Sequence, residues 1–63
     1  MAYTTENRAI DAAVKRARRA NEWRYVVYEP EEGYEVATDE ELATFFAGAS
    51  PSVAVSPMGR IER

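Results

Sequence analysis

The sequence predicts an α+β fold in which one small antiparallel sheet of three or four strands carries two helices on one face. Three observations predict it: an amphipathic stretch over residues 5–20, an aromatic and β-branched run over residues 23–29, and a helix-capping signal at residues 38–41. The expected order of elements is α-β-β-α-β-β. A chain of 63 residues is expected to form a single compact domain, residues 1–63.

The first predicted helix covers residues 5–20. Apolar residues recur on one of its sides at a spacing of 3.6 residues, namely Tyr3, Ile10, Ala13, Val14 and Ala17. Arg8, Lys15 and Arg19 fall on the opposite side. Thr4 is the predicted N-cap, and Asn21 is expected to close the helix in the left-handed conformation.

Residues 23–29 are predicted to form a strand that turns at residues 30–33 and returns over residues 34–37 as a hairpin. Both alternating sets of side chains in the first strand are partly apolar. Trp23, Tyr25 and Val27 fall on one side, with Val26 and Tyr28 on the other. Such a strand either lies in the centre of a sheet or exposes an aromatic surface.

Thr38 and Glu41 match a capping box, which predicts that a short helix starts here and ends near Gly48. The large apolar residues of this helix are predicted to share one face, Leu42, Phe45 and Phe46. Residues 53–55 and 60–62, joined by a Pro- and Gly-containing turn, are predicted as two short closing strands.

Charge is distributed unevenly along the chain. Residues 29–41 hold seven acidic and no basic residues, and the segments 1–28, 29–41 and 42–63 carry +3, −7 and +1. Carboxylates are ordinary in the first turn of a helix and in solvated turns, which accounts for single members of the run. A surface that needs only solubility would mix the two signs, so the run as a whole predicts the complement of a basic surface.

The predicted contact residues are the acidic groups of this run and the tyrosines that flank the turn: Glu29, Glu31, Glu32, Tyr34, Glu35, Asp39, Glu40 and Tyr28. For the tyrosines two interpretations remain open. They belong to the core, where aromatic residues dominate small domains, or they stand on the exposed face as contact anchors.

Composition argues against several functional classes. The chain has no Cys and no His, and it contains no G-x-S-x-G or P-loop motif. We therefore expect no enzyme, no metal site and no cofactor. The acidic overall charge and the absence of a recognisable module argue against direct nucleic-acid binding, so the basic helix face is interpreted as solvated. No apolar run reaches bilayer length, and no signal peptide is recognised. We therefore expect no contact with a membrane and a cytoplasmic location.

The acidic block of residues 29–35 and the acidic helix start at residues 38–41 give the chain its character. In size, acidity, missing Cys and His, and α+β patterning it resembles small accessory proteins of phages and mobile elements, the class of anti-CRISPR proteins and nucleic-acid mimics. The resemblance implies a non-enzymatic inhibitor that occupies a basic, nucleic-acid-binding groove of a larger host protein. The alternative is a homo-oligomer, such as a homodimer, that pairs its acidic end with its basic helix face.

Overall fold

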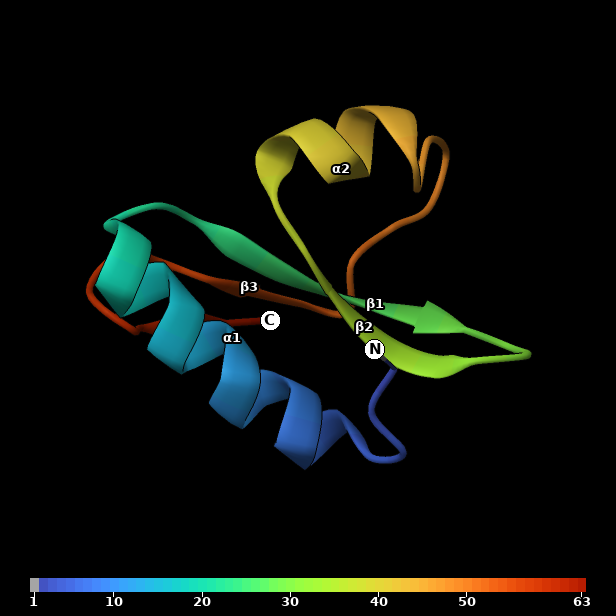
Figure 1. The fold of residues 1–63 in the computed structure, drawn as a ribbon, viewed down its shortest axis with the longest axis horizontal. Helices are drawn as coiled ribbons and strands as arrows, with labels where there is room; N and C mark the ends of the chain where they lie inside the picture. Colours follow the sequence, from blue (N-terminus) through green and yellow to red (C-terminus); the bar gives the residue numbers. More distant parts are fainter. Residues whose placement is uncertain (1) are drawn as a thin grey trace.

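The computed structural model describes residues 2–63 and shows two helices and a four-stranded antiparallel sheet in this part of the chain (Figure 1). The elements are α1 (Glu6–Ala20), β1 (Arg24–Glu29), β2 (Gly33–Ala37), α2 (Asp39–Thr44), β3 (Val53–Val55) and β4 (Ile61–Glu62). The predicted α+β class and the order α-β-β-α-β-β are confirmed. No helix within residues 2–63 is both long enough and apolar enough to cross a bilayer.

The cap of α1 lies one residue later than predicted. Thr5, not Thr4, is the N-cap, and its side chain accepts a hydrogen bond of 3.2 Å from the N–H of Arg8. The reason lies in Tyr3, whose N–H and C=O exchange bonds of 2.7 and 2.8 Å with Tyr34. Because Tyr3 is held as a short strand extension, the chain needs Thr4 to turn away before the helix begins. At the other end, Asn21 adopts the predicted left-handed conformation with φ 56° and ψ 44°.

The sheet has the order β2-β1-β3-β4, which places β1 beside two neighbours. Its antiparallel pairing with β2 runs from Tyr25 opposite Ala37 to Glu29 opposite Gly33. Gly33 has φ 102°, a conformation that glycine adopts without strain, and a Cβ there would stand 2.6 Å from the carbonyl oxygen of Tyr3. The tight hairpin and the close approach of the N-terminal segment therefore both depend on this glycine.

The two helices lie on opposite faces of the sheet, so the prediction that both cover one face is wrong (Figure 1). Val26 packs in the core against α1, while its neighbour Val27 is equally buried at 1% exposure and lies outside that core. Successive residues of a strand point to opposite faces, so both faces of β1 are covered. Tyr25, on the Val27 face, donates a hydrogen bond of 2.7 Å to Asp39 and fixes the start of α2 there.

The core between α1 and the sheet is built from small side chains. It contains Ala9, Ile10, Ala13 and Ala17 from the helix, and Val26, Val53 and Val55 from the sheet. Alanine lets α1 approach the strands closely but removes little apolar area from water per residue. Ile10 is therefore the largest side chain that α1 contributes to this core.

The predicted capping box at the start of α2 is confirmed. The Thr38 hydroxyl accepts from the N–H of Glu41 at 3.1 Å, and the Glu41 carboxylate accepts from the N–H of Thr38 at 3.0 Å. These two bonds satisfy N–H groups that would otherwise lack partners at the helix start.

Thr38→Ala is expected to lower the free energy of unfolding by about 0.5–2 kcal/mol, because one of those N–H groups loses its acceptor. Urea unfolding followed by circular dichroism measures the change. Thr44→Ala is the control, since the Thr44 hydroxyl only donates to a carbonyl of its own helix. Equal stability of the Thr38 variant and the parent would show that the capping box contributes nothing.

Candidate protein-binding surface

Four of the predicted contact residues gather around one hollow at the hairpin end of the sheet. It measures about 450 Å³ and is lined by Ala2, Glu29, Glu31, Glu32, Glu35, Phe45 and Phe46. We call this site the hairpin hollow. Glu35 lies opposite Val27 in the β1–β2 ladder and so points to the face that α2 covers. The chain leaves β2 at its far end, and α2 brings Phe45 and Phe46 back to the hairpin.

Within residues 2–63 the carboxylates of the hairpin hollow are not paired with basic side chains. Among residues 2–63 the ion pairs are Arg24–Glu22 and Arg63–Glu6, both at 3.3 Å, and neither involves the hairpin. Arg16 of α1 borders the surface, because it lines an adjoining hollow of about 260 Å³. The hairpin hollow thus keeps a strong excess of negative charge facing solvent.

A pair of phenylalanines forms the apolar wall of the hairpin hollow. The ring centroids of Phe45 and Phe46 lie 5.6 Å apart, and Phe45 is 83% exposed whereas Phe46 is half-buried. α2 ends at Thr44, short of the predicted Gly48, because the N–H of Phe46 bonds to the carbonyl of Glu41 five residues back and widens the last turn. The prediction that Leu42, Phe45 and Phe46 share one helical face is therefore wrong for Phe45. A signal was present, since adjacent helical residues diverge by about 100°.

Phe46→Ala is expected to lower the free energy of unfolding by about 1–3 kcal/mol, less than for a fully buried ring, because Phe46 is half-buried. Phe45→Ala removes the same atoms from an exposed position and is expected to leave stability nearly unchanged. Thermal unfolding of both variants measures the difference. Equal losses would mean that Phe45 also packs on the sheet.

The two tyrosines beside the turn lie on the other face of the hairpin. Tyr28 stands opposite Tyr34 in the ladder, and their ring centroids are 5.1 Å apart. Tyr34 packs against the α1 core, while Tyr28 is 55% exposed. Each interpretation of the sequence thus applies to one tyrosine, and the sheet separates both from the phenylalanine pair.

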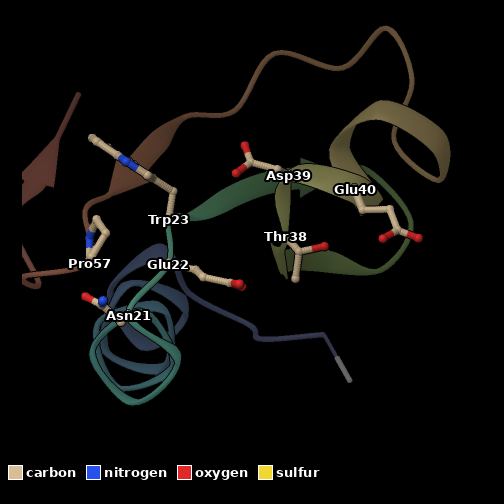
Figure 2. Close-up of a pocket in the computed structure, with 7 residues that line it drawn as sticks. All are labelled: Asn21, Glu22, Trp23, Thr38, Asp39, Glu40 and Pro57. Carbon is tan, nitrogen blue, oxygen red and sulfur yellow. The ribbon is translucent and has the colours of Figure 1, made fainter.

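The last two predicted contact residues, Asp39 and Glu40, lie away from the hairpin. They line a hollow of about 500 Å³ together with Asn21, Glu22, Trp23, Thr38 and Pro57 (Figure 2). We call it the Trp23 hollow. The hairpin adjoins the start of β2, whereas Asp39 follows its end, so the strand holds the two acidic groups apart. The acidic run therefore forms two sites, and the expectation of one continuous acidic end is not met.

Asp39 also governs the ionisation of a neighbour. The hydrogen bond from the Tyr25 hydroxyl, burial of the phenol and the negative charge of Asp39 raise the pKa of Tyr25 above its ordinary value of about 10. The folded state thus favours the protonated phenol. The stability contributed by the protonated Tyr25 phenol is present in full below the pKa that Tyr25 has in the unfolded chain. It is lost as the pH rises through the higher pKa that Tyr25 has in the folded chain.

Tyr25→Phe is expected to cause a small loss of stability at neutral pH, and this difference from the parent should shrink at alkaline pH. The reason is that only the parent has a phenol whose deprotonation abolishes the bond to Asp39. Denaturant unfolding at neutral pH and above the ordinary tyrosine pKa measures both differences. A stability difference that grows with pH would contradict the hydrogen bond as the cause.

A hollow of opposite charge lies along α1. It measures about 430 Å³ and is lined by Tyr3, Arg8, Asp11, Ala12, Lys15, Arg16 and Arg19. Arg16 donates a hydrogen bond of 3.3 Å to the hydroxyl of Tyr3. The predicted basic helix face is thus present and exposed, with Asp11 as its one acidic lining residue.

Residues 2–63 place no group of three or more acidic, His or Cys side chains where they could hold a metal ion. Comparison with protein-family models, with curated proteins and with solved structures gives no match for this chain.

Proposed function

We propose that this chain is a non-enzymatic binding protein whose hairpin hollow docks on a basic groove of a larger protein. One observation carries the proposal: an exposed phenylalanine, Phe45, stands among four carboxylates that have no basic partner within the described residues. An apolar anchor with charged groups at its rim is a common plan of protein interfaces.

The charges set the kind of partner. Basic grooves of sufficient charge density belong largely to proteins that neutralise phosphates with Lys and Arg. A carboxylate surface in such a groove excludes nucleic acid by competition, and the proposed outcome is inhibition of a nucleic-acid-handling complex, in the manner of anti-CRISPR proteins. Complementary charge would also accelerate association and make it sensitive to salt.

The size of the domain indicates how far the interface extends. A standard interface buries about 800 Å² on each partner, roughly a fifth of the 4431 Å² that this chain exposes. The hairpin hollow alone is smaller than that. The proposed contact surface therefore continues from the hollow over the end of α2 and the tip of the hairpin.

The test is capture followed by competition. The chain is immobilised, a host lysate is passed over it, and retained proteins are eluted with duplex DNA or structured RNA. Glu31→Gln with Glu32→Gln removes two charges from the hairpin, and Asp11→Asn with Glu62→Gln removes two exposed charges elsewhere. The expected result is a protein that the parent and the control retain, that nucleic acid releases, and that the hairpin variant fails to retain. Retention that nucleic acid does not affect would overturn the competitive mechanism.

A second candidate is a homo-oligomer, favoured by the presence on one molecule of the acidic hairpin hollow and the basic surface along α1. The hairpin hollow of one copy would then face the α1 surface of another. Sedimentation over a salt series distinguishes the two candidates, because exposed charge pairs weaken as screening increases. A monomer at every salt concentration would exclude the oligomer.

A further inference from the structure

The Trp23 hollow is built by three stretches of chain that are distant in sequence. Asn21 and Glu22 close α1, Trp23 leads into β1, Thr38–Glu40 start α2, and Pro57 comes from the turn between β3 and β4 (Figure 2). Capping bonds hold both helix ends, and the turn is closed by a bond of 2.8 Å between the Gly59 N–H and the Ser56 carbonyl. The walls are therefore fixed by secondary structure before any ligand arrives.

One side of this hollow is apolar. Trp23 and Pro57 are both half-buried, and in Figure 2 their rings lie on one side of the hollow, away from Asp39 and Glu40. The indole of Trp23 is stacked on the ring of Tyr25, with centroids 6.5 Å apart and an angle of 15° between the planes. The near-parallel arrangement places a second aromatic ring beside the indole.

The other side is acidic. Glu22, Asp39 and Glu40 line the hollow, and no Lys or Arg does. Arg24 holds Glu22 at 3.3 Å, which leaves Asp39 and Glu40 as the carboxylates without a basic partner among residues 2–63. The bond from the Tyr25 hydroxyl occupies Oδ1 of Asp39 and orients that carboxylate, so its second oxygen stays available. Carboxylates in a first helical turn are ordinary, but the helix start does not account for the aromatic wall beside them.

We propose that the Trp23 hollow binds the side chain of an arginine presented by the protein partner. The aliphatic stem of the arginine lies across Trp23 and Pro57, and its guanidinium reaches the carboxylates of Asp39 and Glu40. Arginine fits this pairing better than lysine, because its planar head stacks on aromatic rings and donates several hydrogen bonds in one plane. The inference rests on the proposed function in one respect, that the partner's surface is basic.

The site can be tested directly because Trp23 is the only tryptophan of the chain, so its fluorescence reports this hollow alone. The probes are blocked Gly-Arg-Gly peptides and their counterparts with citrulline or lysine at the central position, titrated into the full chain at low salt. Citrulline keeps the shape of arginine and removes its charge. We expect a saturable fluorescence change in the millimolar range for the arginine peptide, weaker binding of the lysine peptide and none of the citrulline peptide.

The variants are Asp39→Asn, which retains an acceptor for Tyr25, and Glu40→Gln, whose carboxylate makes no hydrogen bond within residues 2–63. Together they are expected to weaken the arginine peptide about three- to tenfold. Glu31→Gln with Glu32→Gln is the matched control, and it should leave the titration unchanged. Circular dichroism confirms that each variant is folded. If the double variant is not folded, Glu40→Gln alone is used as the test variant.

Three results would overturn the inference: no saturable change with the arginine peptide, equal binding of the citrulline peptide, or equal or tighter binding of the lysine peptide. The outcome is independent of the test of the hairpin hollow. Loss of protein capture in the hairpin variant together with absent peptide binding would refute the arginine site and leave the proposed function standing. Peptide binding without protein capture would support the arginine site and refute the proposed function.

Discussion

Ile10→Ala is expected to unfold a large part of the population at room temperature. Ile10 is 6% exposed and is the one large side chain among the alanines with which α1 covers the sheet. Its truncation should cost about 2–5 kcal/mol through lost burial and the cavity left behind. A single core in a domain of this size supplies only about 3–5 kcal/mol of net stability, so the loss consumes most of it. Urea unfolding monitored by circular dichroism measures the effect.

The control uses the same substitution at the second isoleucine of the chain. Ile61 lies in the short edge strand β4 and is 48% exposed. Ile61→Ala is expected to change stability by less than about 1 kcal/mol, because roughly half of the side chain is already in water. Similar losses at the two positions would mean that the stability of the domain does not depend on the core between α1 and the sheet.

Local signals sufficed for the elements of this fold. The capping box at Thr38 and Glu41, the left-handed Asn21 and the hairpin turn before Tyr34 each depend on a few neighbouring residues, and the structure contains all three. The N-cap of α1 was predicted at the wrong threonine because Thr4 and Thr5 are equivalent as local caps. Only the contact between Tyr3 and Tyr34, more than thirty residues apart, selects the second threonine.

Which faces of the sheet the two helices cover could not be predicted from local sequence patterns. Val26 and Val27 are both apolar, and this pattern fits a central strand covered on both faces as well as a strand with an exposed aromatic side. The structure shows the first case, with α1 on the Val26 face and α2 on the Val27 face. The placement of two helices on opposite faces is the physical consequence of that double burial.

The candidate site was predictable in composition but not in geometry. Hairpin carboxylates such as Glu31 and helix-start carboxylates such as Asp39 are close in sequence, yet β2 lies between them. Five residues of strand span roughly 13 Å between the first and last Cα, which is enough to make two sites of one acidic run. Phe45 was predicted to share a helical face with Leu42 and Phe46, but α2 ends before it.

Reversing the charge of the hairpin hollow is expected to abolish partner binding. Glu31, Glu32 and Glu35 are changed to Lys as one set, and Arg8, Lys15 and Arg19 to Glu as a second set. None of the six side chains belongs to the core or takes part in an ion pair of residues 2–63, so both variants should stay folded.

The first set should weaken binding by about a hundredfold or more, mainly through the association rate, because the charges that steer the encounter now repel the basic groove. The second set lies on the α1 surface and should leave affinity within about threefold. Association and dissociation rates measured at several salt concentrations separate the two effects, since lost steering also flattens the salt dependence of association. A loss confined to the second set would make α1 the working surface and exclude the acidic docking mechanism. Equal losses from both sets would instead identify the charge-paired oligomer, in which each hollow needs the other.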